Sequence, residues 1–498
     1  MYILLNKLEE MWYNNTIEVI NMEITKNKEH LILHDKNIVK GILLLALPVM
    51  LNNIIKAFHD VVDTFLVSQI NAPEPIVSAQ IAAIGFVSPI MTICQALAIG
   101  MMTAGTALMS QYIGAKKEGK AAKVSGQLLM LCGAVGVIFN ILLYFLAPYI
   151  LNLMDAQGSL YTYSLTYIRI RSFELTGLFI FYAYQATRQS QGDTLTPVII
   201  NGTSIIINIV LTIIFIFGMK MDLSGAAIGT VIANMIIIPA CIIHMIKNKS
   251  LPLSKETIKP DWKYSKKIFS LGAPAAISQA FTSLAFLIIN GTMSTYENTL
   301  NIDYSILAPI SIGGRINSLL LFPVMGIGTV LATFVGQNIG AGNKERAKNA
   351  FRQSLLLVIS MTTIGAILLF PFRELLTKIF LSNPDEIALC SRYVVFLLIG
   401  LPLMGVFQCF IGCFQGAGRT DLSLWLSTIR LWVLRIPVLL IMVHFLNVGY
   451  QSVWICMTIS NFGAMIVGCI LYRFVDYEPR TSKLQQKVKK EVLEVNNG

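Results

Sequence analysis

Residues 111–115 read Gln-Tyr-Ile-Gly-Ala and residues 337–341 read Gln-Asn-Ile-Gly-Ala, each followed directly by a cluster of basic residues. The two stretches are 226 positions apart, and the same offset superposes other landmarks without a gap. These are Pro48 on Pro274, Gly100 on Gly326, Thr103 on Thr329, Gln127 on Gln353, Tyr167 on Tyr393 and Thr194 on Thr420. A shared apolar composition does not select one offset, so the chain contains an internal repeat.

The repeated unit has the composition of a membrane protein. Of 498 residues, 55% are hydrophobic and 13% are charged, about half the charged fraction of soluble proteins. Apolar runs long enough to cross a bilayer recur along the whole chain. Charged, Gly and Pro turns divide these runs into twelve predicted spans. They lie near 41–69, 76–113, 121–153, 159–188, 194–218, 222–246, 267–295, 304–338, 347–380, 386–415, 421–446 and 450–473.

Six spans per copy give both copies the same topology, as parallel repeats about an axis along the membrane normal. We therefore predict an all-α membrane protein of twelve transmembrane helices in two six-helix bundles. Transporters place their sites in the cleft between such repeats. The predicted parts are an N-terminal extension (1–37), a first lobe (38–247), a linker (248–266), a second lobe (267–475) and a tail (476–498).

The net charge of +11 comes from the placement of the 38 Lys and Arg residues. Most of them lie before residue 41, in 114–123, 185–192, 247–267 and 340–352, and beyond 472. These segments alternate with loops that hold almost none, which is the positive-inside pattern. It predicts a multi-pass protein of the inner or plasma membrane with both termini in the cytoplasm and lipids as partners. It argues against a nucleic-acid partner. The polar extension is predicted to be disordered.

Motifs for covalent or metal chemistry are absent from the sequence. The eight Cys residues are scattered without CxxC spacing, so we predict neither a disulfide framework nor a metal site. Neither HExxH nor GxSxG occurs, which argues against an intramembrane enzyme. No GxxxxGK[ST] loop occurs either, so the energy for transport must come from an ion gradient or from another subunit.

Nine stretches in order along roughly 40–475 resemble the multidrug and toxic compound extrusion (MATE) family. They are Ala46-Leu-Pro48, Asp60-Val-Val-Asp63-Thr64, Gln111-Tyr-Ile-Gly-Ala115, Gln191-Gly-Asp-Thr-Leu-Thr-Pro197, Asn208-Ile-Val-Leu211, Gly225-Ala-Ala-Ile-Gly-Thr230, Val335-Gly-Gln-Asn-Ile-Gly-Ala-Gly342, Gly416-Ala-Gly-Arg-Thr420 and Arg430-Leu-Trp-Val-Leu-Arg-Ile-Pro437. The resemblance implies an antiporter that exports organic cations, drugs or toxic metabolites in exchange for H⁺ or Na⁺, by rocker-type alternating access. We expect a monomer with no cofactor other than the coupling ion.

Asp63 is the main candidate for cation coupling. It stands deep in the first predicted span among apolar neighbours, where an ionised carboxylate costs at least about 2–3 kcal/mol. Such a group normally faces a wet cavity or the bundle interior, where it can exchange a proton or Na⁺. The alternative is a structural hydrogen bond to backbone or to an Asn. His59, one turn earlier, either titrates near neutral pH or is a packing residue.

The resemblance also implies partners for Asp63 in the first lobe. Asn208 and Thr230 match the family's cation cluster, but Thr212 stands where the family has a second acid. Glu174 could supply the missing charge; alternatively it neutralises Arg171, three residues away on the same helix face. The family's other arrangement, with acids in the seventh and tenth spans, is replaced here by Thr282 and Val406. Coupling through the second lobe is therefore not expected.

Aromatic and Met side chains near the predicted cleft suit a cavity for flat cations, because aromatic faces attract positive charge and Met repacks. The candidates are Phe58, Met91, Tyr182, Gln185, Phe281, Met325 and Phe407. Each could instead be a core or lipid-facing residue. The runner-up function, a flippase for a lipid-linked precursor, requires a strongly basic cavity, and Arg315, Arg430 and Arg435 are few for that role. Arg430 and Arg435 could attract anions, or they could snorkel or pair structurally.

Overall fold

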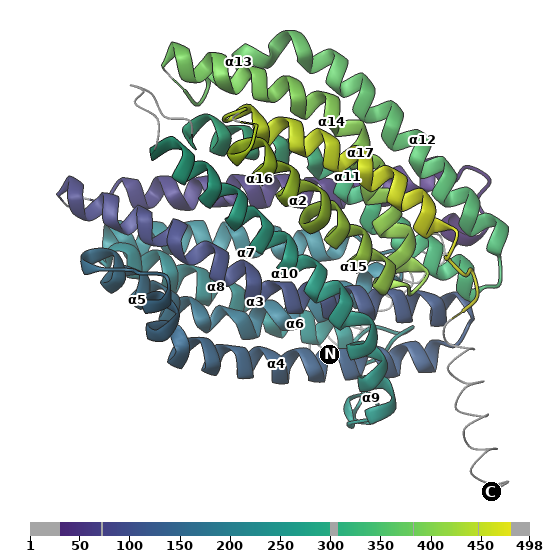
Figure 1. Cartoon of the computed structure of the whole chain (residues 1–498). Coiled ribbons are helices and arrows are strands. Elements are labelled where there is room, and N and C mark those ends of the chain that lie inside the picture. The colour runs from purple at the N-terminus through teal and green to yellow at the C-terminus, as the bar shows by residue number, and fades with distance from the viewer. Residues whose placement is uncertain (1–29, 71–72, 299–306, 382, 447, 480–498) are drawn as a thin grey trace, which may run out of the picture.

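The computed structural model describes residues 30–70, 73–298, 307–381, 383–446 and 448–479, and this part of the chain contains helices and no strand (Figure 1). The prediction for residues 1–29 of the extension and 480–498 of the tail lies outside the described residues. Long helices of similar direction make up the body of the molecule. The predicted all-α membrane fold is confirmed.

Each lobe contains the six predicted spans, some of them divided. In the first lobe the helices are α2 (Ile38–Ser68), α3 (Glu74–Gly114), α4 (Glu118–Leu153), α5 (Gly158–Ser172), α6 (Glu174–Ser190), α7 (Leu195–Ile213) with the π-helix η1 (Ile214–Gly218), and α8 (Asp222–Ile246). The predicted linker holds the short α9 (Lys255–Ile258). In the second lobe they are α10 (Trp262–Asn298), α11 (Leu307–Gly340), α12 (Lys344–Leu369), the 3₁₀ turn η2 (Phe370–Phe372), α13 (Arg373–Lys378), α14 (Pro384–Gly416), α15 (Thr420–Thr428), the π-helix η3 (Ile429–Arg435), α16 (Ile436–His444) and α17 (Gln451–Tyr472).

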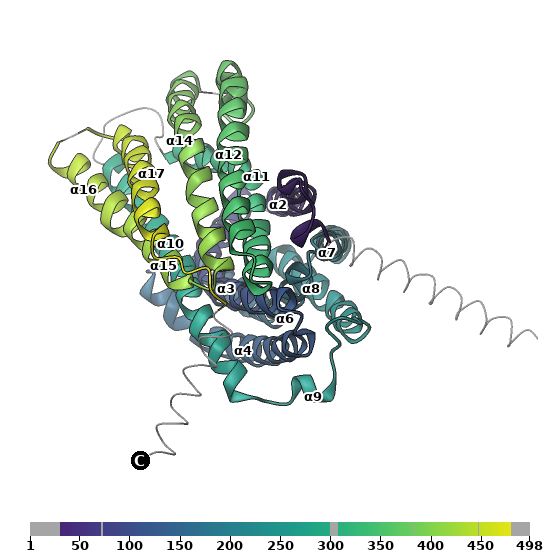
Figure 2. The ribbon, with the colours of Figure 1, turned by 90° about the vertical axis from the view of Figure 1, so that its right-hand side faces the viewer.

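The helix ends repeat at the offset found in the sequence. Glu118 and Lys344, which begin α4 and α12, are 226 residues apart, and so are Ser190 and Gly416, which end α6 and α14. In Figure 2 most green and yellow helices of the second lobe lie on one side of the bundle, and the blue helices of the first lobe lie on the other. The internal repeat is therefore present in the fold as well as in the sequence.

One predicted span is interrupted. Eleven helices in the described part of the chain are long and apolar enough to cross a membrane. The predicted span 159–188 is not among them, because the structure breaks it at Phe173 into α5 and α6. Glu174 begins α6 at this break and is buried. The equivalent span of the second lobe, α14, continues unbroken.

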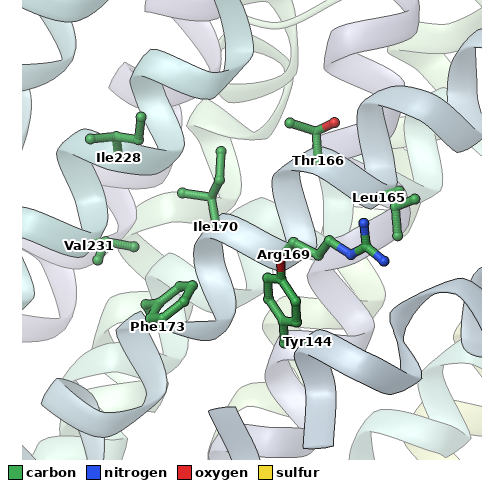
Figure 3. A pocket seen from close by; sticks show the side chains of 8 residues that line it. All are labelled: Tyr144, Leu165, Thr166, Arg169, Ile170, Phe173, Ile228 and Val231. Atoms are coloured by element: carbon green, nitrogen blue, oxygen red, sulfur yellow. The ribbon is translucent and has the colours of Figure 1, made fainter. Parts of the chain in front are cut away.

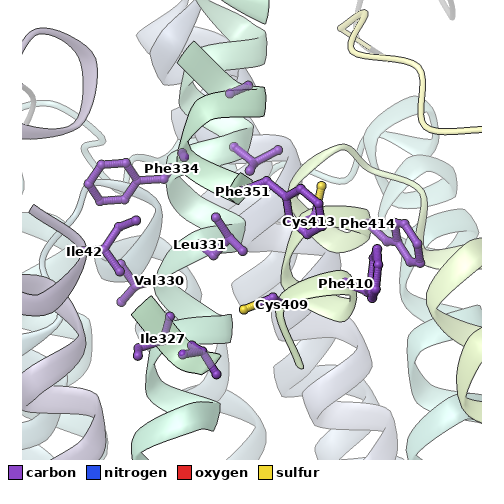
Figure 4. Close-up of a cluster of buried hydrophobic side chains, with 14 of the residues drawn as sticks. Ile42, Ile327, Val330, Leu331, Phe334, Phe351, Cys409, Phe410, Cys413 and Phe414 are labelled. Carbon is purple, nitrogen blue, oxygen red and sulfur yellow. The ribbon is translucent and has the colours of Figure 1, made fainter. Parts of the chain in front are cut away.

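The first helix of each lobe packs partly on the other lobe. The early part of α2, with Ile42 and Leu45, shares a buried cluster with α11, α12 and α14. In Figure 4, Ile42 lies against Val330 and Phe334 of α11. The corresponding part of α10, with Ile268, packs with α3, α4 and α6. The two lobes are therefore joined by a pair of exchanged helix ends.

The chain that precedes each lobe is fixed to the other lobe. Before the second lobe, Gln127 of α4 donates from Nε2 to the carbonyls of Thr257 (2.9 Å) and Lys259 (2.7 Å), around α9. Before the first lobe, Arg346 of α12 in the second lobe donates to the carbonyls of Ile32 (2.9 Å) and Asp35 (2.7 Å). Residues 30–33 are helical and Ile32 is fully buried, so the prediction of disorder is wrong for this segment. The segment is ordered because residues 31–33 are apolar and can be buried against the protein. The prediction missed them because the extension as a whole is polar.

Candidate functional site

The two lobes meet at the end of the bundle where α3 and α11 finish, and we call this the closed end. Gln111 of α3 donates from Nε2 to the carbonyl of Gly416 at the end of α14 (3.1 Å). Gln337 of α11 donates from Nε2 to the carbonyl of Ser190 at the end of α6 (2.7 Å). The last carbonyls of a helix have no partner within that helix. Each lobe therefore caps a helix of the other lobe, and the two caps are related by the repeat.

Glycines bring the lobes into backbone contact at this end. A Cβ added to Gly114 would lie 1.9 Å from the carbonyl oxygen of Gln337, and one added to Gly340 would lie 2.1 Å from that of Gln111. Real Cβ atoms do not approach so closely, so only glycine fits at these two positions. The repeated Gln-x-Ile-Gly motif thus forms the closed end, and the basic loops after it lie at the same end of the molecule.

Four polar side chains lie along one face of the otherwise apolar helix α2. They are Asn52, Lys56, His59 and Asp63, spaced four, three and four residues apart. Residues at this spacing share a helix face. Asn201 of α7 donates to Oδ1 of Asn52 (2.9 Å), and the Lys56 Nζ lies 5.8 Å from the ring centroid of Tyr182 in α6. The stripe therefore faces the interior of the first lobe.

Asp63, His59, Asn208 and Thr230 come together at the far end of this stripe. His59 Nε2 lies 2.8 Å from Asn208 Oδ1 and 3.5 Å from Asp63 Oδ2. Asn208 Nδ2 donates to Thr230 Oγ1 (2.9 Å), which itself donates to the carbonyl of Ala226 (3.0 Å). Because an amide oxygen only accepts, this arrangement requires a proton on His59 Nε2. The cluster thus joins α2, α7 and α8 through Asp63, Asn208 and Thr230, the three residues predicted from the sequence. Its fourth member is His59, for which the sequence left open a titrating role and a packing role.

Thr212 lies beside the cluster, one turn after Asn208. It is fully buried, and its Oγ1 has no hydrogen-bond partner among the described residues. A Cβ added to Gly229 of α8 would lie 2.9 Å from this Oγ1, so the two helices are in close contact here. The position that holds an acid in the family holds a small neutral side chain against a helix backbone.

Glu174 forms an ion pair with Arg171, the contact expected from its spacing. Arg171 also donates to the Tyr167 hydroxyl (2.8 Å). Tyr167 belongs to the same buried cluster as Leu66 and Ala226, and it is close enough to Asp63 for an electrostatic interaction. Glu174 therefore neutralises Arg171, which was the alternative to a role in cation coupling. Through Tyr167, this network ends close to the cation cluster.

The predicted substrate residues differ in their surroundings. Phe58, Phe281 and Met325 are exposed on the protein, and Gln185 is half-buried with Oε1 unbonded among the described residues. Met91, Tyr182 and Phe407 are buried. The rings of Phe281 and Trp432 lie 5.4 Å apart, and the guanidinium of Arg430 lies 4.1 Å from the ring centroid of Phe407. None of the seven lines the small cavity beside Trp454 or the larger hollow described next.

A hollow of about 500 Å³ lies elsewhere, between α4, α5 and α8 (Figure 3). None of the predicted substrate residues lines it. Arg169 reaches along one wall, with its guanidinium 5.2 Å from the ring centroid of Tyr144. Apolar side chains, among them Ile228 and Val231, form much of the rest. This hollow is distinct from the Asp63 cluster.

The chain is similar to known proteins over most of its length. A family model described as MatE matches residues 48–214 and 274–441, so its two copies begin at the offset of the internal repeat. The chain is 24% identical over 462 residues to the probable multidrug resistance protein NorM of Thermotoga maritima, covering 90% of this chain and 95% of that one. It is 26% identical over 390 residues to a FAD transporter of Shewanella oneidensis, covering 75% and 81%. A solved structure described as the outward-facing conformation of a multidrug resistance MATE family transporter of the MOP superfamily has a TM-score of 0.81 at 22% identity, covering 92% of this chain and 98% of that chain.

Proposed function

The chain belongs to the MatE family, and from that premise we propose that it exports organic cations in exchange for protons. Members of this family are membrane transporters and not enzymes, which confirms the prediction on that point. The names of several relatives describe multidrug resistance or multidrug export proteins. The flippase alternative is not favoured by any of these comparisons. The coupling ion, the direction of transport and the substrate class are the proposed parts.

The observation that carries the proposal is the joint position of Asp63 and His59. The His59 Nε2 proton lies on Asn208 Oδ1, one of the neutral oxygens that a Na⁺ ion at Asp63 would need. A proton needs no such oxygen, since the carboxylate of Asp63 can accept it directly. With Thr212 in place of a second acid, Asp63 is the acid in the described part of this cluster, which suits one proton better than a multidentate metal site.

α2 connects this cluster with the closed end. Its early half packs on the second lobe, and its later half carries His59 and Asp63 on the first lobe. Pro48 lies within the early half, before the polar residues, where it removes one backbone hydrogen bond and favours bending. A proton on Asp63 would change how α2 fits α7 and would thereby change the contact between the lobes. Coupling then follows if proton and substrate prefer different arrangements of the lobes.

In this proposal the basic loops face the cytoplasm, according to the positive-inside rule. The closed end is then the cytoplasmic end, and the structure corresponds to an outward-facing state. The protein acts as a monomer in the plasma membrane, with no cofactor besides the proton. The exposed Phe58, Phe281 and Met325 are the proposed substrate contacts on the side that the closed end leaves accessible.

Export by purified protein in liposomes, with rhodamine 6G as the cationic dye, tests the proposal. The wild type should export dye when a pH gradient is imposed in Na⁺-free buffer. Asp63→Asn keeps the shape of the side chain but cannot bind and release a proton, so gradient-driven export should stop. Asp155→Asn is the matched control, because Asp155 is exposed in a turn at φ 56°, a conformation that Asn tolerates.

Export by Asp63→Asn at the wild-type rate would overturn the role of the carboxylate. Export driven by a Na⁺ gradient at equal pH, but not by a pH gradient, would overturn the choice of ion while retaining antiport.

A further inference from the structure

The second lobe buries two guanidinium groups where the first lobe has no charge. Arg430 is 5% exposed and Arg435 is 1% exposed, and both lie in the π-helix η3. The repeat places Ser204 and Ile209 at the equivalent positions of α7. π-helices inside α-helical spans occur frequently at functional sites. These two extra charges of the second lobe therefore lie in one irregular turn.

Neither guanidinium has an acidic partner among the described residues. Arg435 donates to Ser460 Oγ (2.9 Å) and to Asn461 Oδ1 (2.9 Å). Arg430 donates to the same Asn461 oxygen at 3.5 Å and to the Met404 sulfur at 3.0 Å, a weak acceptor. Buried charges are normally paired, as Arg171 is with Glu174 in the first lobe. Two buried positive charges thus share one amide oxygen.

Donors without a strong acceptor lie in and beside a small cavity next to these residues. It is lined by Asn317, Tyr393, Phe396, Leu397, Gly400, Met404, Trp454, Met457, Thr458 and Asn461. Arg430 Nε and the indole N–H of Trp454 are buried and have no acceptor among the described residues. Among the described residues, the Tyr393 hydroxyl donates to the Met457 sulfur (3.3 Å). Two donors of the lining, on Trp454 and Tyr393, are therefore unpaired or bonded to sulfur, and Arg430 lies behind the lining residues Met404 and Asn461, to which it donates. An anion would complete this surrounding.

We propose that this cavity binds the carboxylate or phosphate group of a planar organic anion, which the transporter carries in addition to cations. The Arg430 guanidinium is stacked on the Phe407 ring at 4.1 Å and is separated from the cavity by Met404, so its N–H groups would reach an oxygen pair once Met404 moves. Tyr393 and Trp454, stacked at 5.7 Å, supply an aromatic wall. The cavity has about 10 Å³ open to a water-sized sphere in this conformation, so Met404 and Met457 must repack to admit the anionic group. Transport of the anion rests on the function proposed above; binding does not.

Binding is tested first, by thermal unfolding of the purified full-length protein in detergent. Benzoate and inorganic phosphate serve as separate probes of the carboxylate and phosphate classes. At least one should raise the Tm of the wild type and leave the Tm of Arg430→Gln unchanged. Arg352→Gln, which removes an exposed Arg from α12, is the matched control and should respond as the wild type does. If neither anion raises the wild-type Tm, or if each raises the Tm of Arg430→Gln equally, the proposal is overturned.

The unliganded Tm separates a binding role from a structural one. If the two guanidiniums await an anion, replacement of Arg430 by the apolar Arg430→Met should leave the Tm unchanged or raise it, because an uncompensated buried charge is lost. A lower Tm for Arg430→Met, combined with no response of the wild type to either anion, would identify the residue as structural and overturn the proposal.

Transport is tested in liposomes with fluorescein as the anion and rhodamine 6G as the cation, both quantified after lysis at one fixed pH. Arg430→Gln and Arg435→Gln should lose fluorescein export by roughly tenfold or more, the effect of removing a charged hydrogen bond of about 1.5–3 kcal/mol, and should keep rhodamine export. Rhodamine export without any Arg430-dependent fluorescein export would overturn anion transport while the proposed antiport stands. Loss of rhodamine export by the wild type itself would overturn the antiport, and the Tm response to anions would still decide the site.

Discussion

The two lobes have equivalent helices and opposite chemistry. At the closed end, Gln111 and Gln337 make the same contact with helix ends 226 residues apart. Midway along the bundle the equivalence ends: the first lobe holds Asp63 in a polar cluster, and Ile289 stands at the equivalent position of α10. The second lobe instead holds Arg430 and Arg435. The two copies of the repeat therefore share the residues that join the lobes, and they differ in the charged residues inside each lobe.

Substitutions at equivalent positions of the two lobes distinguish the conserved contact at the closed end from the charged clusters inside the lobes. A substitution at the closed end should have the same effect in either lobe. A substitution at the polar clusters should have an effect in one lobe only.

The largest effect is expected at the glycines of the closed end. Gly114→Ala and Gly340→Ala would each place a methyl group within about 2 Å of a carbonyl oxygen in the other lobe, so the closed end could not form. Dye export should fall to the level of empty liposomes in both variants. Gly365→Ala is the control, because a Cβ at Gly365 meets nothing within 4 Å. Normal export by either closed-end variant would show that this contact is not needed in the transport cycle.

The next effect concerns the Arg171–Glu174 pair. The repeat places Gly400 of the second lobe at the position equivalent to Glu174, so the pair has no counterpart there. Glu174→Gln leaves the guanidinium of Arg171 buried without its counterion and should destabilise the protein by about 3–5 kcal/mol. Unfolding midpoints in detergent measure this loss. The double variant Arg171→Met/Glu174→Gln should recover most of the stability and retain gradient-driven export. If the double variant is stable but uncoupled, Glu174 takes part in cation coupling and the structural interpretation fails.

A smaller effect is expected from the hydrogen bond between Asn208 and Thr230. Thr230→Val keeps the shape of the side chain and leaves the buried Asn208 amide without its acceptor, at a cost of about 1–3 kcal/mol. Export driven by the pH gradient should decrease. Cys456 is the equivalent residue of α17, and Cys456→Val should leave coupling intact. Equal losses of export in the two variants would mean that the first lobe has no special role.

The smallest effect is expected where the linker is fixed to α4. Gln127→Ala removes the hydrogen bonds to the carbonyls of Thr257 and Lys259 and should cost about 1–2 kcal/mol of stability. Gln353→Ala, at the equivalent site of α12, should cost less, since no side-chain bond to the preceding segment is made there by Gln353 in the described part of the chain. Comparison of the two Tm values measures the difference, and a larger loss for Gln353→Ala would contradict it.

Much of this fold is predictable because a strict repeat and the bilayer both constrain the sequence. The offset, the lobes and the closed-end motif are visible as Gln-x-Ile-Gly in two places. The break at Phe173 was not predicted, because Phe is compatible with an unbroken span and nothing in the composition marks it. The order of residues 30–35 was missed because three apolar residues are too few for a span and were averaged into a polar extension.

The site was only partly predictable, for reasons of geometry. Asp63 could be selected because an ionised carboxylate in a span is costly. Asn208 and Thr230 were selected because they match the cation cluster that the family resemblance implies. Lys56 and Asn52 were overlooked, although their spacing to His59 and Asp63 along one helix face was a usable signal. Phe58 and Phe407 could not be distinguished by sequence, because an aromatic residue facing lipid, cleft or core has the same periodicity; the structure exposes the first and buries the second.

The caps at the closed end consist of amide-to-carbonyl hydrogen bonds between side chains and helix termini, together with glycine contacts that involve no large apolar side chain. When such a contact separates, water can replace each lost hydrogen bond nearly one for one, and little apolar surface is exposed. Opening and closing should then differ little in free energy. A ligand that distinguishes the two arrangements by only about 1–3 kcal/mol is enough to reverse the balance between them.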